Sequence, residues 1–212
     1  MFNGDELPAL TQDRLDLLAK MLPLYPKQAR PLDLYESNFS SKWLLRVDTS
    51  FDTWWVAALF NWEEEARSFS IRFDSDGLKP DRRYRIYDFW NQRPLGIARG
   101  SITIPGVASH DCKVIAIREN RPHPWLLSTD YHLTQGGVEL GQLSWDEESL
   151  TLSGVFIGRR AGNAVLTFTV PETYAIRAID CPGAAHQVTE EGVRLELTGL
   201  GGEDRSFKLM FA

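Results

Sequence analysis

Carboxylate side chains are the first residues in this sequence that could carry out chemistry. Hydrolysis of a glycosidic bond, for example, needs two carboxyl groups about 5 to 10 Å apart in a pocket, one of them with a shifted pKa. The acidic runs at 63–65 and 146–148 each follow directly on a predicted strand, which is typical of solvated turns. Residues 74–77, Asp-Ser-Asp-Gly, resemble the start of a calcium loop without its later ligands, so we expect a β-turn. No acidic residue is therefore predicted to be catalytic.

Histidine and cysteine, the usual zinc ligands and nucleophile partners, are few and scattered. The histidines are His110, His123, His132 and His186, and the cysteines are Cys112 and Cys181. They form no i, i+4 histidine pair and no Cys-x-x-Cys unit, and the chain has no phosphate loop, dinucleotide motif or Gly-x-Ser-x-Gly elbow. His110 is close to Cys112, but we expect an ordinary buried thiol there. We predict no catalytic residue, no metal site and no cofactor.

Tryptophan is the remaining candidate, since the chain contains seven. An exposed aromatic face on a β-sandwich can stack on the apolar face of a sugar ring, which is one route to carbohydrate binding. Core positions are the competing interpretation: Trp54 and Trp55 point to opposite sides of one strand between apolar neighbours. Trp43 and Trp90 also have apolar neighbours, and Trp125 is expected to fill a seam between domains. No tryptophan is assigned to sugar, so the carbohydrate-binding residues remain unknown.

Composition and charge exclude several classes of protein. The 212 residues are 43% hydrophobic and 25% charged, which suits one large or two small folded domains. A net charge of -6 provides no cationic field for nucleic acid or an anionic membrane. The longest apolar run, residues 54–60, is far shorter than the roughly 20 residues that cross a bilayer. The acidic residues 1–6 lack the features of an export signal, which predicts a cytoplasmic location.

Apolar spacing predicts one helix, from Thr11 to Leu22, ahead of all other elements. Thr11 can cap its N-terminus, and Pro23 prevents its continuation. The apolar residues that share one face are Leu15, Leu18, Ala19 and Leu22. No later helix is predicted to pack against this face, so it must dock on the rest of the chain or on another molecule.

From about Lys42 onward, short β-branched and aromatic runs separated by turn residues predict an all-β architecture. Two prolines at 121–124 divide the strands into two groups. We predict an N-terminal segment 1–35 that carries the helix, a first β-sandwich over 36–124 and a second, smaller one over 125–212. The expected strands are 43–47, 54–61, 68–73, 84–89, 100–104, 113–118, 139–145, 149–156, 164–170, 174–179, 193–198 and 206–211.

Patterns inside the strands predict which sides are buried. Residues 54–60 are apolar on both alternating faces, so we expect a central strand that is covered on each side. Residues 68–73 alternate, with Ile71 and the two phenylalanines pointing inward. In the second group we expect a bulge near Gly154 and a final hairpin turn at 199–204.

Several segments resemble one family of proteins. Residues 7–11, 14–18 and 29–35 resemble the join after the catalytic barrel of melibiase-type glycoside hydrolases, the α-galactosidase and raffinose-synthase-like group. Segments that resemble the C-terminal β-sandwich region of these enzymes are 56–62, 87–90, 95–96 and 127–136. The similarity is clearest up to Gly136. It implies that the helix at 11–22 corresponds to the last helix of the barrel, whose usual packing surface this chain does not contain.

The resemblance does not extend to catalysis. The family's catalytic aspartates lie at the ends of barrel strands, and this chain is about one barrel too short to contain them. The resemblance implies a non-catalytic C-terminal portion of an α-galactosidase-like hydrolase, split or truncated, that braces a catalytic barrel or shapes sugar access. An independent carbohydrate-binding module is the alternative, and a stand-alone glycosidase ranks last. The expected partners are a barrel chain or a second copy, contacted through the N-terminal helix, and a carbohydrate.

Overall fold

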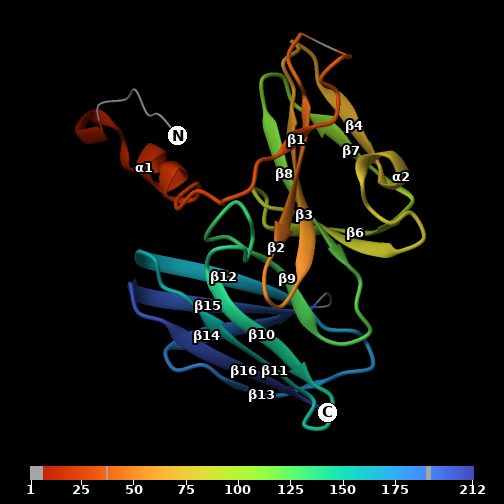
Figure 1. Ribbon diagram of the computed structural model, residues 1–212. Coiled ribbons are helices and arrows are strands. Elements are labelled where there is room, and N and C mark those ends of the chain that lie inside the picture. Colours follow the sequence, from red (N-terminus) through yellow and green to blue (C-terminus); the bar gives the residue numbers. More distant parts are fainter. Residues whose placement is uncertain (1–6, 37, 190–191) are drawn as a thin grey trace.

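The computed structural model describes residues 7–36, 38–189 and 192–212 (Figure 1). These residues form two antiparallel β regions, a 3₁₀ turn η1 (Leu7–Ala9), one N-terminal helix α1 (Gln12–Ala19) and a short helix α2 (Phe73–Asp76). The predicted all-β class is therefore confirmed. None of the described helices is long and apolar enough to span a membrane. Residues 1–6, on which the export-signal prediction depends, lie outside the described part of the chain.

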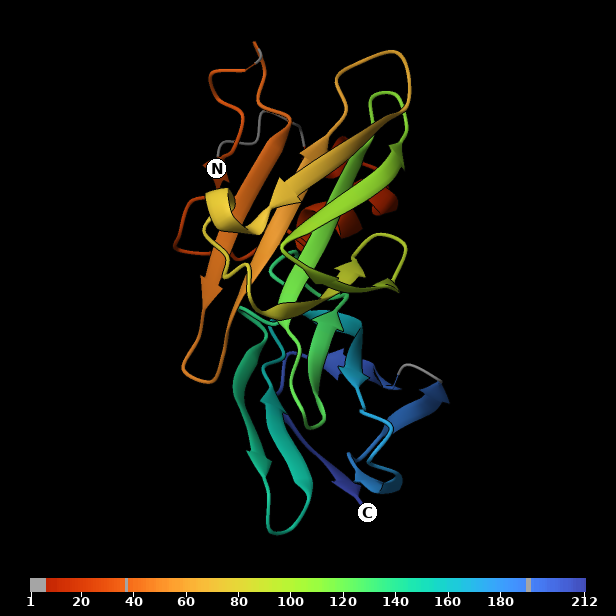
Figure 2. The same ribbon diagram turned by 90° about the vertical axis from the view of Figure 1, so that its right-hand side faces the viewer.

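The first region is one eight-stranded antiparallel sheet that bends back on itself (Figure 2). Its order is β1-β2-β3-β8-β5-β6-β7-β4, and β6 meets β7 at the single pair Arg99 and Ser101. The apolar core lies between the two halves, where Leu59 and Ile115 share a cluster with Ile71. The strands are β1 (Arg30–Pro31), β2 (Lys42–Asp48), β3 (Thr53–Phe60), β4 (Arg67–Arg72), β5 (Arg83–Asp88), β6 (Arg93–Arg99), β7 (Ser101–Val107) and β8 (Cys112–Glu119).

The second region is a sandwich of two four-stranded antiparallel sheets, ordered β10-β11-β16-β13 and β14-β15-β12-β9. Alternate residues of β11, Leu152 and Phe156, point into a core that also contains Leu166 and Phe168 of β12. The strands are β9 (Trp125–Thr129), β10 (Leu140–Asp146), β11 (Thr151–Phe156), β12 (Ala161–Thr169), β13 (Ile176–Asp180), β14 (Ala184–Thr189), β15 (Gly192–Gly201) and β16 (Arg205–Phe211).

Each strand predicted from the sequence overlaps an observed strand, but β1, β6, β9 and β14 were missed. Strand β6 contains Pro94 and Gly96, which disfavour a strand when read locally, and β14 has mainly exposed, polar side chains without alternation. Strand β3 lies between β2 and β8, which confirms the central position predicted for it. Ile71 and the phenylalanines of 68–73 are buried, as their alternation predicted.

Three local predictions were wrong. Strands β15 and β16 belong to different sheets, so residues 199–204 form no hairpin: 199–201 still belong to β15, and 202–204 connect the two sheets. The bulge lies in β10 at Gly141, while Gly154 leaves room for the ring of Phe207, which a Cβ would displace. Residues 73–76 form α2 in place of a β-turn. The first two errors share a cause, because strand pairing is decided by residues distant in the sequence.

Helix α1 is shorter than predicted and is held by its C-terminal end. It ends at Ala19 and not at Leu22, because a residue that precedes a proline is disfavoured in helical conformation. Thr11 precedes the helix but makes no side-chain cap bond. Arg160 of the second region donates to the Ala19 carbonyl at 2.9 Å, and the Leu133 amide donates to the Lys20 carbonyl at 2.9 Å. These bonds supply donors to carbonyls that a helix end leaves unpaired.

Candidate functional site

The side of the first sheet that points away from its core is apolar, and we call it the outer face. Alternation places every second residue of β2, β3 and β8 on this side, so that Trp43 lies opposite Ala58, and Phe60 opposite Cys112. A sheet with one side in water has polar residues at such positions. The outer face consists of Trp43, Leu45, Val47, Trp54, Val56, Ala58, Phe60, Phe89, Cys112 and Val114.

The Trp54 end of the outer face is covered by other parts of the chain. Tyr25 and Leu133 pack against its buried residues. The Tyr25 hydroxyl also bonds to the main chain of Asp48, donating to the carbonyl at 2.9 Å and accepting from the amide at 2.8 Å. The ammonium of Lys20 lies 5.5 Å from the centre of the Phe89 ring. This half of the outer face is therefore buried and forms a separate, small hydrophobic core.

The Phe60 end has no comparable cover among the described residues. Trp43, Phe60 and Cys112 are only half-buried, while Trp62 is 47% exposed and Phe39 is 70% exposed. The rings of Phe60 and Trp62 stack with centroids 5.2 Å apart and planes at 7°. We call these five residues the open end of the outer face.

The tryptophans of the open end have fixed orientations. The indole N–H groups of Trp43 and Trp62 both donate to the Ser40 carbonyl, at 3.1 and 3.2 Å. Trp62 is further held by its stack on Phe60. A side chain that is already ordered loses little entropy when a partner binds, so the open end is a preorganised contact surface.

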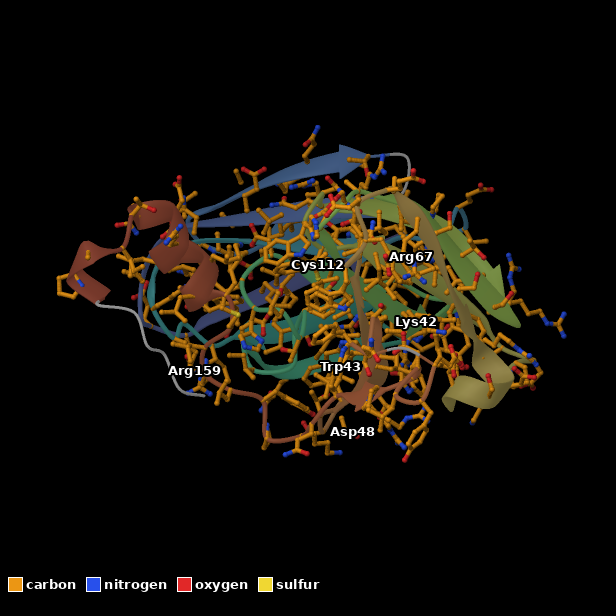
Figure 3. The ribbon with its side chains drawn as sticks, turned by 90° about the horizontal axis from the view of Figure 1, so that it is seen from above. Lys42, Trp43, Asp48, Arg67, Cys112 and Arg159 are labelled. Carbon is orange, nitrogen blue, oxygen red and sulfur yellow. The ribbon has the colours of Figure 1, made fainter. Side chains whose placement is uncertain are left out.

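Helix α1 lies on the same side of the first sheet as the outer face (Figures 1 and 3). Seen from above, Trp43 and Cys112 lie on the side of the sheet toward α1, and Lys42 and Arg67 lie farther from it (Figure 3). None of the α1 side chains is buried, and Leu17 is 46% exposed. On the apolar face predicted for this helix, Leu15, Leu18 and Ala19 are half-buried, so only part of that face is available for contact.

A buried ionic cluster joins the first region to the second. The side chain of Asp52, in the turn between β2 and β3, is 6% exposed. Its carboxylate accepts from Arg118 at 3.0 Å, from Arg121 at 2.7 Å and from the Trp125 indole N–H at 2.8 Å. Asp52 and Arg118 belong to the first region, whereas Trp125 begins β9 of the second region. We call these four residues the Asp52 clamp, because the Asp52 carboxylate bonds to side chains of both regions.

Arg118 is the most buried member of the clamp, with a side chain that is 2% exposed. Burial lowers its pKa to about 10, so it remains cationic at neutral pH. The guanidinium lies 3.7 Å from the centre of the Trp54 ring and donates to the Gln135 carbonyl. Within the described residues, its Nε and the Nε2 of Gln135 have no hydrogen-bond partner. Stabilisation of the buried Arg118 charge therefore depends strongly on its ion pair with Asp52.

Glu139 is a fully buried carboxylate, but its oxygens are committed to local structure. It accepts from the hydroxyl of Thr129, from the amide of Gly136 at 2.8 Å and from the amide of Val138 at 3.2 Å. These bonds tie the loop before β10 to the end of β9. The Glu139 carboxylate therefore satisfies three donors of this loop and stabilises it.

The acidic runs considered from the sequence lie in exposed turns. Residues 63–65 and 146–148 are exposed. Asp146 accepts the amide hydrogens of Ser149 at 3.0 Å and Glu148 at 2.9 Å, and these bonds lower its pKa. Such positions organise turns and do not form a pocket.

His110 and Cys112 do not form a nucleophile–base pair. His110 lies in the turn before β8, with φ of 52°, and its ring nitrogen is 3.3 Å from Glu64. Burial raises the pKa of the Cys112 thiol to about 11, so little thiolate exists at neutral pH. Nor does the described part of the chain bring three His, Cys, Asp or Glu side chains together as metal ligands.

The tryptophans divide into buried and exposed groups. Trp54 is fully buried and Trp125 is 6% exposed, at the core and seam positions predicted for them. Trp55 is half-buried against the first core. Trp62 and Trp90 are the exposed ones, at 47% and 36%. Trp62 was not singled out from the sequence, although it lies two residues beyond Phe60, at the spacing of the side chains that point outward from β3.

Sequence reasoning also missed the buried polar residues Asp52, Arg118, Gln135 and Glu139. Arg118 did carry a signal, because it follows the apolar residues 114–117 within a strand. Asp52 carried none, since its contact with Arg118 spans 66 positions of the sequence.

Comparison with known proteins matches residues 49–117 to the family model of the alpha galactosidase C-terminal beta sandwich domain. This match confirms, for that part of the chain, the predicted resemblance to the C-terminal region of melibiase-type enzymes. Two similar solved structures are alpha-galactosidase I from Mortierella vinacea (18% identity, TM-score 0.32) and the isomalto-dextranase of Arthrobacter globiformis T6 complexed with panose (16% identity, TM-score 0.31). They align with 38% and 86% of this chain, which spans only 21% and 36% of their respective lengths. No curated protein sequence matches the chain.

Proposed function

We propose that this chain is a non-catalytic β-sandwich region that packs against the catalytic barrel of an α-galactosidase-like glycoside hydrolase. It braces the barrel or shapes the access of sugar to it. The contact surface is the open end of the outer face together with helix α1. The family match over residues 49–117 supports this class of enzyme, and those residues include β3 and almost all of β8, which form much of the outer face.

One observation carries the proposal. Strand β3 has apolar residues on both sides, as a strand inside a protein does, but at its Phe60 end only the core side is covered, since Leu59 is fully buried whereas Ala58 and Phe60 are half-buried. At the Phe60 end, aromatic side chains on the outer side meet water. Contiguous exposed apolar surface on a folded protein commonly marks a site of association. A barrel that packed against the open end would bury these exposed aromatic side chains, so that β3 would be covered on both sides there.

The test is co-expression of the tagged chain with α-galactosidase-type catalytic barrels encoded in the same genome. We expect a one-to-one complex in size-exclusion chromatography with light scattering. The double variant Phe60→Ser, Trp62→Ser should weaken this complex by at least about tenfold, because aromatic anchors dominate protein interfaces. Val188→Ser, which removes an even more exposed apolar side chain (62%) from the second region, should have no effect.

Three outcomes would contradict the proposal. The first is that none of these barrels binds while the chain remains folded by circular dichroism. The second is a homodimer of the chain alone that the Phe60→Ser, Trp62→Ser variant dissociates, which would make a second copy the occupant. The third is hydrolysis of an aryl α-galactoside by the purified chain, lost on mutation of one acid, which would make it a stand-alone glycosidase.

An independent carbohydrate-binding module is the second candidate function. The observation that favours it is the ring of Trp62, which is 47% exposed and held flat against Phe60. An aromatic platform of fixed orientation suits the apolar face of a sugar ring. Titration with galactosides and other oligosaccharides, followed by tryptophan fluorescence, tests this function. A saturable change that disappears in Trp62→Ser supports it, and no saturable change with any sugar rejects it.

A further inference from the structure

The second region has a groove on the side where its two sheets separate. Strands β13 and β14 are consecutive in the chain but belong to different sheets, and a turn closed by the Ala184 amide and the Cys181 carbonyl joins them. Each is the last strand of its sheet. The sandwich is therefore open between them, and the groove there has a volume of about 600 Å³. This size falls within the range of small-molecule sites.

The walls of the groove are mainly apolar. Val170, Ile176 and Ile179 are half-buried and pack against the core of the second region, so the groove reaches the margin of that core. Val188 of β14 lines the opposite side and is 62% exposed. The half-buried ring of Tyr174 is fixed by edge-on contacts with Trp145 and Phe211, whose ring centroids lie 5.4 and 6.2 Å from its own. A ligand with an apolar face would cover these side chains.

Polar side chains line the same groove and are free to bind a ligand. Arg177, His186 and Glu172 are exposed and line it. In the part of the chain that the structure describes, none of the three has a hydrogen-bond or ion-pair partner. Arg177 and Glu172 carry charges of opposite sign, so a strongly charged ligand of either sign would meet repulsion from one of them. Donors and acceptors of both kinds instead suit a neutral ligand with many hydroxyl groups.

We propose that the groove between β13 and β14 binds a neutral oligosaccharide. The apolar walls contact the C–H face of a sugar ring, and Arg177, His186 and Glu172 hydrogen-bond its hydroxyl groups. The choice of a sugar rests on the proposed function, which places this region beside a sugar-hydrolysing domain. The groove lies in the second region and is separate from the open end of the outer face, so the chain would contact sugar and barrel through different surfaces.

The experiment is a titration of the isotope-labelled chain with raffinose and, separately, with maltotriose, followed by amide chemical shifts. Raffinose contains galactose and maltotriose does not, so the two arms separate a galactoside from a glucan. We expect saturable shifts confined to the amides of β13, β14 and residues 170–174 with at least one of the two sugars. Arg177→Ala and His186→Ala should each weaken binding about fivefold, the value of one hydrogen bond to a neutral group.

Matched controls are Arg99→Ala and His110→Ala, which remove exposed side chains of the same types from the first region. Each should leave the affinity unchanged. The proposal is overturned if neither sugar gives saturable shifts, if the shifts fall on the open end, or if the controls weaken binding as much. It is also overturned if the groove binds decanoate but neither sugar. Because sugar binding is measured without a barrel, its failure leaves the barrel complex intact, and failure of the barrel complex leaves the sugar titration interpretable.

Discussion

The two β regions differ in the side chains that their sheets present away from the core. In the second region, the outward positions of β10, β11 and β16 include Ser144, Ser153 and Lys208, and the two serine hydroxyls lie 3.0 Å apart in the open. In the first region, the corresponding positions of β2, β3 and β8 are apolar apart from the buried Arg118, and they include Trp43 and Phe60. The outward positions of these second-region strands therefore suit contact with water, whereas those of the first region suit contact with a further layer of protein.

The largest effect is expected where the two regions meet. Asp52→Ala should lower the free energy of unfolding by about 3–5 kcal/mol, because it leaves the Arg118 guanidinium buried and unpaired. Urea unfolding followed by tryptophan fluorescence measures this change. Asp48→Ala is the matched control, since Asp48 bonds to Lys27 and Arg46 at the surface. Equal losses in the two variants would show that the clamp does not couple the regions.

Neighbouring residues of β3 test the difference between the two sides of the first sheet. Leu59→Ala, on the core side and fully buried, should cost about 2–5 kcal/mol. Phe60→Ala, on the open end, should cost less than about 1.5 kcal/mol, although it removes more atoms, because its ring already contacts water. The same urea titrations compare them. A larger loss for Phe60→Ala would mean that the open end is already part of a folded core.

Each region carries one cysteine, which allows a chemical comparison. At about pH 8, Cys112 should react with a disulfide reagent about 100-fold more slowly than in the urea-unfolded chain, because burial raises its pKa from 9.0 to about 11. Burial also raises the pKa of Cys181, but by less, so Cys181 should react faster. Cys181→Ser and Cys112→Ser variants separate the two rates. Equal rates would contradict the difference in burial.

Binding of a catalytic barrel should change the reaction rate of only one of the two cysteines. Because Cys112 belongs to the open end, the barrel should slow its reaction further. The rate for Cys181, in the second region, should stay the same. If the barrel slowed only the reaction of Cys181, the barrel would bind the second region, and the proposed contact surface would be wrong.

The smallest change in stability is expected from pH. Burial of the ring lowers the pKa of His132 below its ordinary value of 6.5, an effect that the hydrogen bond to the Pro23 carbonyl opposes without cancelling. The unfolded chain then binds the proton more readily, so this contribution to stability is complete above about pH 6.5 and is lost as the pH falls below it. His132→Gln should reduce the loss of stability between about pH 7.5 and about pH 5.5. The exposed His110→Gln is the control, and an equal reduction there would exclude His132.

Much of the fold could be predicted because it follows from local patterns. The alternation of 68–73 identified a strand with one wet side, and the continuous apolar run 54–60 identified a central strand. Pairing between distant strands could not be predicted in this way. The segment 199–204 has the composition of a hairpin turn, but its first half continues β15 and residues 202–204 cross between the sheets, because β16 pairs with β11 and β13.

The candidate site, like the fold, could be predicted only in part from the sequence. The apolar residues of the outer face are visible in the sequence as the excess of aromatic side chains and as the two-sided pattern of β3. The sequence does not reveal which of these residues stay exposed. Trp54 and Trp62, for example, are of the same residue type and differ in what covers them. The Asp52 clamp was also invisible, since its members are brought together by the packing of two regions.

The sequence by itself determined that this protein is all-β, that β3 is apolar on both sides, and that part of the chain resembles the β-sandwich of α-galactosidases. These properties depend on residue type and short-range spacing. Only the tertiary structure decided that the second side of β3 is covered at one end and open at the other. Exposure is a property of neighbours from distant segments, here Tyr25 and Leu133, whose positions no local pattern specifies.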